Sequence, residues 1–162
     1  MENSDHYQHM NMRDSNRPFI LIAEDDEEDR MLTCDALQEC GLLNSLHFVE
    51  DGEQLLNYLL RKGEYDDNEL YPMPGLILLD LNMPRKDGRE ALREIKENPT
   101  LKLIPIIVLT TSKAEEDIIK TYNLGVNSFI TKPVTFAELV DVMKTLNTYW
   151  FKTVRLPDLT ET

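Results

Sequence analysis

Four short apolar runs of this chain each end in polar side chains that could take part in chemistry. The polar residues are Glu24, Asp25 and Asp26 after the run at 19–23, Asp80 after 76–79, Thr110 and Thr111 after 106–109, and Lys132 after 128–131. Carboxylates can hold a divalent cation, while a hydroxyl and an amine can hold phosphate oxygens. Together they form the inventory of a metal-assisted phosphoryl-transfer site. Taken singly, each residue has an ordinary structural explanation, since Asp80 could equally form a turn or cap a helix.

The elements that must position these side chains alternate between strands and helices. We predict strands at 19–23, 46–49, 76–80, 104–109 and 128–131, and helices at 26–40, 52–61, 89–97, 114–123 and from 136 onward. This alternation predicts parallel strands joined by right-handed crossovers. The expected fold class is α/β, a flavodoxin-like (βα)5 doubly wound sheet of five parallel strands in the order 2-1-3-4-5. Ligands of such sheets bind beyond the carboxyl ends of the strands, where the sequence places its polar residues.

Over roughly residues 18 to 150 the chain resembles the receiver domain of two-component response regulators. The resemblance is carried by the acids after the first strand, Asp80 with Asn82-Met83-Pro84 and Asp87-Gly88 behind it, Thr110, and Lys132-Pro133. The stretches LILLDLNMPRKDGREAL and VLTTSKAEEDI and the long insert before the third strand look most like the single-domain regulators of bacterial and cyanobacterial phytochrome histidine kinases. The resemblance implies a phosphoacceptor of a His-Asp phosphorelay, phosphorylated on Asp80 by a sensor histidine kinase, possibly a phytochrome. It implies no enzyme activity beyond magnesium-dependent self-phosphorylation and dephosphorylation.

The acidic residues predict a metal site, because clustered carboxylates repel one another unless a cation lies between them. All-oxygen ligands suit Mg²⁺, for which Mn²⁺ or Ca²⁺ can substitute. We assign Asp25 and Asp80 as direct ligands, the backbone carbonyl of Asn82 as a third, and Glu24 as a ligand through water. The choice between Asp25 and Asp26 stays open, since Asp26 could instead cap the following helix.

The resemblance assigns roles to the remaining site residues. Lys132 would bind a phosphate oxygen and, in the resting state, pair with Asp80, and the Lys132–Pro133 peptide would be cis. Thr110 would donate its hydroxyl to the phosphoryl group and move inward, which lets Phe129 rotate. Thr111 would lie beside the path of incoming water and slow dephosphorylation.

Composition limits the classes of protein that remain. The chain has 162 residues, 41% of them hydrophobic, and a net charge of −13, which suits one domain and argues against a nucleic-acid partner. Two cysteines without a CxxC motif and no long apolar run favour a cytoplasmic protein with no membrane association. We divide the chain into a disordered tail at 1–17, a receiver domain at 18–150 and a C-terminal extension at 151–162. The insert at 63–74 is interpreted as an extended surface connection.

An apolar period of 3.6 residues continues beyond the expected end of the last helix. It comprises Phe136, Leu139, Val140, Met143, Leu146, Trp150 and Val154. Exposed aromatic clusters often mark interfaces, so Tyr149, Trp150 and Phe151 predict a homodimer. The alternative is that this extension folds back over its own domain.

Two other functions fit part of the pattern. A haloacid-dehalogenase-like phosphohydrolase also uses an aspartate nucleophile with magnesium, threonine and lysine, but it needs a second acid two residues on, where this chain has Asn82. An interaction module that works without phosphorylation would have no need of Asp25, Asp80, Thr110 and Lys132 together.

Overall fold

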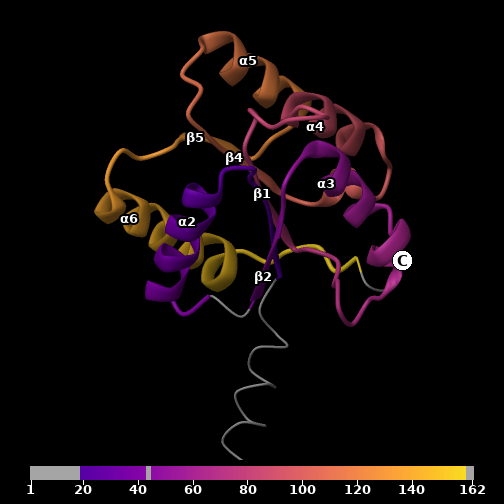
Figure 1. Ribbon diagram of the computed structural model, residues 1–162, viewed down its shortest axis with the longest axis horizontal. Coiled ribbons are helices and arrows are strands. Elements are labelled where there is room, and N and C mark those ends of the chain that lie inside the picture. Colours follow the sequence, from indigo (N-terminus) through magenta and orange to yellow (C-terminus); the bar gives the residue numbers. More distant parts are fainter. Residues whose placement is uncertain (1–18, 43–44, 160–162) are drawn as a thin grey trace, which may run out of the picture.

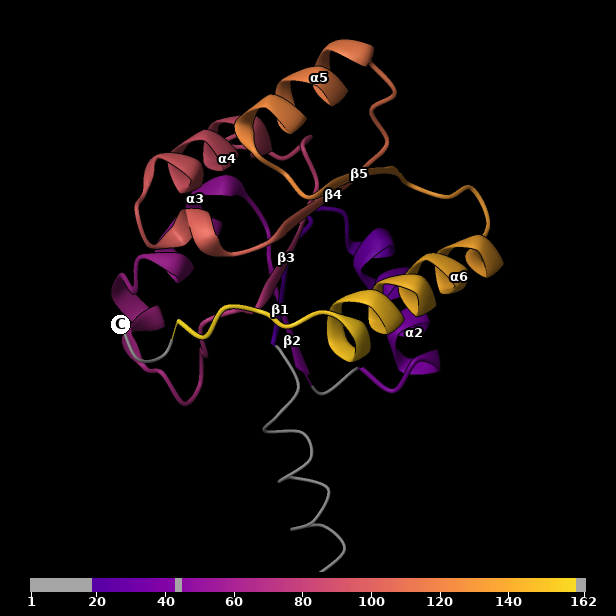
Figure 2. The ribbon, with the colours of Figure 1, turned by 180° about the vertical axis from the view of Figure 1, so that it is seen from behind.

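A five-stranded parallel sheet forms the centre of the computed structural model, which describes residues 19–42 and 45–159. The strands are β1 (Ile20–Ala23), β2 (Leu46–Val49), β3 (Leu76–Leu79), β4 (Ile106–Thr110) and β5 (Ser128–Thr131). They lie in the order β2-β1-β3-β4-β5 and every neighbouring pair is parallel (Figures 1 and 2). The predicted fold class and strand order are therefore confirmed. The predicted tail at 1–17 lies outside the described residues.

Helices cover both faces of the sheet. One face carries α2 (Glu27–Glu39) and α6 (Phe136–Leu146), and the other carries α3 (Gly52–Leu59), α4 (Gly88–Glu97) and α5 (Glu115–Leu124), as Figures 1 and 2 show from opposite sides. No helix among the described residues combines the length and apolar character needed to cross a membrane.

The three central strands, β1, β3 and β4, are almost entirely apolar because both of their faces are buried. Along β1, Leu21 and Ala23 point into the core beneath α3 and α4, while Ile20 and Ile22 point into the core beneath α2 and α6. Successive side chains of a strand alternate between faces, so a continuous apolar run serves both cores. This arrangement leaves the ends of the strands as the natural place for polar residues.

Local capping sets the helix boundaries. The Asp26 carboxylate accepts a hydrogen bond from the Asp29 N–H at 2.9 Å, and the Asp51 carboxylate accepts one from the Gln54 N–H at 2.8 Å. Helix α3 ends at Leu59, earlier than the predicted residue 61, because Arg61 takes a left-handed backbone conformation with φ of 61°. The fourth strand begins at Ile106 rather than at 104.

The insert at 63–74 is anchored more firmly than predicted. Its first residues form a short 3₁₀ helix, η2 (Gly63–Asp66), which buries Tyr65, so the prediction of an extended connection was wrong there. The rings of Tyr58, Tyr65 and Tyr71 pack with centroids 4.9–5.8 Å apart, and the Tyr58 hydroxyl donates to the Pro72 carbonyl at 2.7 Å. Aromatic packing, which composition alone does not reveal, holds the insert against α3.

The chain beyond α6 continues as a π-helix, η4 (Asn147–Thr153). Trp150 and Phe151 are half-buried against the core beneath α2 and α6, whereas Tyr149 is 51% exposed and stacks edge-on against Trp150. The following segment crosses the amino-terminal end of the sheet, and Leu159 packs against the opposite core (Figure 2). The extension therefore packs partly on its own domain, the alternative that the sequence had left open.

Candidate functional site

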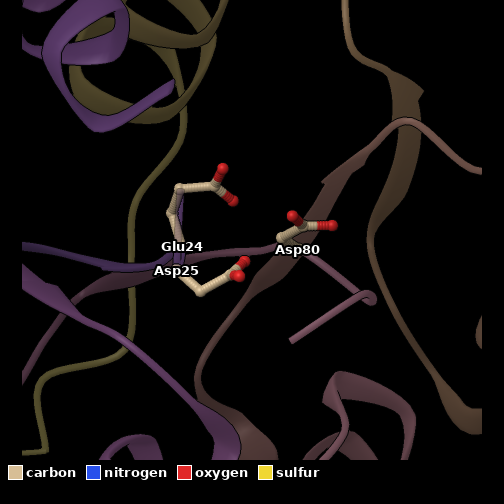
Figure 3. Close-up of side chains that lie close together, drawn as sticks. All are labelled: Glu24, Asp25 and Asp80. Carbon is tan, nitrogen blue, oxygen red and sulfur yellow. The ribbon is translucent and has the colours of Figure 1, made fainter. Parts of the chain in front are cut away.

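Three carboxylates converge beyond the carboxyl ends of β1 and β3. Glu24 and Asp25 follow β1 and Asp80 follows β3, and one oxygen from each lies within 4.8 Å of the others. Figure 3 shows the three side chains lying close together, with the carboxylates of Glu24 and Asp25 extending toward Asp80. Glu24 and Asp80 are buried and Asp25 is exposed. Parallel strands that end at the same edge of the sheet bring these acids together, as the sequence predicted.

Backbone hydrogen bonds fix these strand ends. The Asp80 N–H donates to the Ala23 carbonyl at 3.0 Å and the Glu24 N–H to the Val49 carbonyl at 2.9 Å. The parallel ladder thus runs one residue beyond the strands and fixes where the two carboxylates begin. Asp26 points elsewhere, since its carboxylate caps α2. The structure therefore brings Asp25, and not Asp26, into the cluster.

Two glycines allow the loop after Asp80 to pack closely. A Cβ at Gly88 would lie 2.4 Å from the Asp80 carbonyl oxygen, and a Cβ at Gly52 would lie 2.3 Å from the Lys86 carbonyl oxygen. The Gly88 N–H donates to the Leu81 carbonyl at 3.0 Å, and the Gly52 N–H donates to that of Lys86 at 2.9 Å. The loop at 81–87 is thereby tied both to itself and to the start of α3.

Lys132 joins the cluster from the end of β5. Its Nζ lies 2.8 Å from Glu24 Oε1, 2.8 Å from Asp29 Oδ2 and 3.2 Å from Asp80 Oδ2. Burial alone would lower the pKa of Lys132, but the hydrogen bonds to Asp29 and Glu24 and the charge of Asp80 raise it above its usual value. The structure shows the predicted pairing with Asp80 and adds Asp29, a residue that the sequence interpretation missed. Asp29 lies three residues after the Asp26 cap, in the first turn of α2, and this spacing is the sequence feature that could have identified it.

The second oxygen of Asp80 is held by neutral donors. Thr110, fully buried, donates its hydroxyl to Asp80 Oδ1 at 2.8 Å, and the Asn82 N–H donates to the same oxygen at 3.2 Å. The side chain of Asn82 is exposed. Donors from β4, β5 and the following loop thus surround the Asp80 carboxylate and fix its orientation.

The acidic cluster is suited to a divalent cation. Within the part of the chain that the structure describes, Glu24 Oε2 is buried and has no hydrogen-bond partner. Burial, followed by the neighbouring Asp80 carboxylate, raises the pKa of Glu24 to about 9, and Lys132 offsets this only in part. A buried oxygen without a donor, next to two further carboxylates, is a site that a hard cation would satisfy. The donor set therefore fits a divalent cation.

The remaining predicted residues lie around this cluster. Phe129 pairs with Val108 across β4 and β5 and is half-buried against the core beneath α3 and α4. Thr111 is exposed and lines a cavity of about 360 Å³ between α2 and α6 that also borders Lys132. The Lys132–Pro133 peptide is trans, so the expected cis bond was wrong; the trans form is the intrinsically favoured one.

A further polar network, missed by the sequence interpretation, leads away from Thr110. The Ser112 N–H donates to Thr110 Oγ1 at 3.4 Å, and the Ser112 hydroxyl donates to Asp117 Oδ2 at 2.7 Å. Arg89 binds both oxygens of Asp117 at 2.7 Å. Arg89 and Ser112 hold the pKa of Asp117 down to about 2. This bidentate pair joins α4 to α5.

Comparisons with known proteins agree with this geometry. A model of the response regulator receiver domain family matches residues 20–144. Response regulator Rcp1 of Synechocystis sp. is 43% identical over 145 residues, which are 89% of this chain and 97% of the relative. The structure of the phosphorylated cyanobacterial phytochrome response regulator RcpA has a TM-score of 0.81 at 42% identity and covers 88% of this chain and 99% of RcpA. That of Mn²⁺-bound Rcp1 has a TM-score of 0.76 at 42% identity, covering 87% and 99%. The chain belongs to the response regulator receiver domain family.

Proposed function

We propose that this chain is a phosphoacceptor response regulator, in which Asp80 receives a phosphoryl group from a phosphohistidine of a sensor histidine kinase. The observation that carries the proposal is the environment of Asp80, whose two carboxylate oxygens are bound by Thr110 and Lys132 beside the Glu24–Asp25 pair. A nucleophilic carboxylate held this way is positioned for attack at phosphorus.

In the proposed step, an Asp80 oxygen attacks phosphorus, a P–O bond forms and the P–N bond to histidine breaks. The imidazole nitrogen keeps the electron pair, and the product is an acyl phosphate. Lys132 would exchange Asp80 for a phosphoryl oxygen, and Thr110 would turn its hydroxyl from Asp80 Oδ1 to another. The chain thus supplies positioning and charge, the main needs of phosphoryl transfer.

We assign the divalent ion as Mg²⁺, with Mn²⁺ or Ca²⁺ able to replace it. Asp25 and Asp80 would bind it directly, together with the Asn82 carbonyl, and Glu24 would bind it through water. When bound, the ion neutralises charge on the transferring phosphoryl group. The unpartnered Glu24 oxygen supports this assignment, and so does the Mn²⁺-bound structure of the relative Rcp1.

Thr110 and Phe129 are the proposed conformational switch. Thr110 is already bound to Asp80, and Phe129 lies on the neighbouring strand. Movement of the hydroxyl toward a phosphoryl group would shift an existing equilibrium between two conformations. Exposed Thr111, on the cavity beside Lys132, is proposed to slow hydrolysis, so Thr111→Ala should shorten the lifetime of the acyl phosphate.

Incubation with MgCl₂ and acetyl phosphate, followed by intact mass measurement, tests the central proposal. We expect one phosphoryl group on the wild type and none on Asp80→Asn. An unmodified wild type, or equal modification of Asp80→Asn, would refute the assignment. Sustained turnover of a phosphomonoester would instead indicate the phosphohydrolase alternative.

A phytochrome-type kinase is the proposed partner, on the basis of similarity to RcpA, which is described as a phytochrome response regulator. Phosphotransfer from such a kinase in vitro, compared with an unrelated histidine kinase, tests this pairing. We propose a cytoplasmic location for the protein and no nucleic-acid partner, consistent with the net charge of −13.

Homodimerisation through Tyr149, Trp150 and Phe151 remains a proposal. Tyr149 is the most exposed of the three, and its ring packs edge-on against that of Trp150. Because Trp150 and Phe151 also pack on their own core, Tyr149→Ser is a cleaner test than truncation. Light scattering should show a dimer for the wild type and a smaller species for the variant, whereas a monomeric wild type would end the proposal.

A further inference from the structure

A groove of about 290 Å³ lies between α4 and α5, on the face of the sheet opposite α2 and α6. Its lining includes Arg89, Arg93, Lys120, Asp117 and Leu124. The lining therefore carries three positive charges and one negative charge, although the whole chain carries a net charge of −13. The groove is a local exception to the acidic character of the protein.

The sequence of α4 creates this exception by separating its charges. Arg89, Arg93 and Lys96 recur at intervals of four and three residues and share one side of the helix. Glu90, Glu94 and Glu97 repeat the same intervals one residue later, about 100° further round. Glu94 lies against Lys86 at 2.6 Å, away from the groove. The acids of α4 thus do not neutralise its cationic side.

Two of the three cations that line the groove remain available to a ligand. Arg89 is occupied by Asp117 and Asp87. Arg93 and Lys120 are exposed, and the side chain of neither makes a hydrogen bond or salt bridge with any residue in the ranges that the structure describes. Lys120 contributes to the electrostatic field at Asp117. The Arg89–Asp117 pair thus links α4 to α5 at the groove, while the charged side chains of Arg93 and Lys120 remain unpaired.

The charge of the groove favours a short anionic ligand over a long one. At physiological ionic strength the Debye length is about 8 Å, so a ligand confined to the groove is shielded from the distant acids of the protein. An extended polyanion such as nucleic acid would reach beyond the groove and be repelled by the protein's net charge of −13. Half-buried Leu124 adds an apolar contact of the kind that peptide side chains use.

We propose that the groove between α4 and α5 binds a short acidic peptide segment of a partner protein, whose carboxylates pair with Arg93 and Lys120. The groove shares no residue with the acidic cluster. Binding should therefore occur in the unphosphorylated protein and should be unchanged in Asp80→Asn, which separates this inference from the proposed phosphoacceptor function.

Fluorescence anisotropy with a labelled hexaglutamate peptide tests the proposal on the full chain. Arg93→Gln combined with Lys120→Gln should weaken binding about tenfold, as expected when two partly exposed charge pairs are lost. The matched control, Lys62→Gln with Lys144→Gln, removes the same charge from exposed positions elsewhere and should leave binding within about twofold of wild type.

Several results would overturn the inference. They are no saturable binding to the wild type, an equal loss in both double variants, or amide chemical-shift changes on peptide addition that map outside α4 and α5. A labelled hexaglutamine peptide should not bind, and binding as tight as that of hexaglutamate would remove the electrostatic basis. Circular dichroism melting curves would show that both double variants fold.

Discussion

Replacing Lys132 by Met tests how the acidic cluster is held together before any ion binds. The ammonium lies 2.8–3.2 Å from the carboxylates of Glu24, Asp29 and Asp80, and the Lys132 side chain is 15% exposed. Methionine retains much of the packing volume and removes the charge. The carboxylates would then face one another with no cation between them.

The expected cost follows from these contacts. At about 3 Å and an effective dielectric near 20, each charge pair is worth about 5 kcal/mol, most of it offset by the desolvation of the ammonium. Breaking a buried ion pair from one side usually costs about 3–5 kcal/mol. Glu24 can respond by taking up a proton, because burial and Asp80 raise its pKa and the loss of Lys132 removes an interaction that lowers it, so we expect the lower end of that range. A loss of about 3 kcal/mol would lower Tm by about 6–12 °C in a domain of this size.

Urea unfolding with and without MgCl₂ measures this cost. Without the ion, Lys132→Met should lose about 3 kcal/mol, and the exposed control Lys62→Met should stay within about 0.5 kcal/mol of wild type. Mg²⁺ should stabilise Lys132→Met more than the wild type, because no amine competes for the same carboxylates. A variant as stable as wild type without the ion, or equal stabilisation of both by Mg²⁺, would refute the reasoning.

Three further predictions concern the surrounding structure. The folded-state pKa of Asp117, about 2, lies below the usual aspartate value of 3.8, so its pairing with Arg89 contributes stability above pH 3.8 that is lost as the pH falls through 2. Asp117→Asn should therefore cost about 1 kcal/mol at pH 6, and this difference from wild type in urea unfolding should shrink below pH 3.8. Gly88→Ala should cost about 3 kcal/mol in the same assay, because its Cβ would overlap backbone atoms; a cost under about 1 kcal/mol would show that the loop yields easily. Tyr58→Phe should cost about 1–2 kcal/mol by leaving the Pro72 carbonyl without its donor, and hydrogen exchange should quicken within 63–74 but not in β4.

The sheet and the positions of its polar ends could be predicted from the sequence because they depend on local rules. An apolar run such as 76–79 that ends in Asp80 indicates both a buried strand and where its chemistry lies. The sequence favoured Asp25 but left Asp26 open as the alternative, since both follow the same strand. The structure decides it through the hydrogen bond by which Asp26 caps α2.

Two of the unpredicted contacts join side chains that lie far apart in the sequence. Asp29 and Lys132 are 103 residues apart, and their contact depends on how α2 is rotated against the sheet. Arg89 and Asp117 meet only because α4 and α5 are neighbours. The structure of the insert at 63–74 depends on the packing of aromatic rings around Tyr65. No periodic pattern in the sequence predicts this packing.

The segment after η4 passes around the amino-terminal end of the sheet and connects its two faces. Phe151 packs against one hydrophobic core and Leu159 against the other, and the residues between them cross the amino-terminal end of the sheet. The two helical layers are thus linked by a route that does not pass through the strands. If α6 separates from the sheet in a local unfolding event, this segment must loosen or Leu159 must leave its core. Local unfolding on one face of the sheet should therefore cost additional free energy from contacts on the other face.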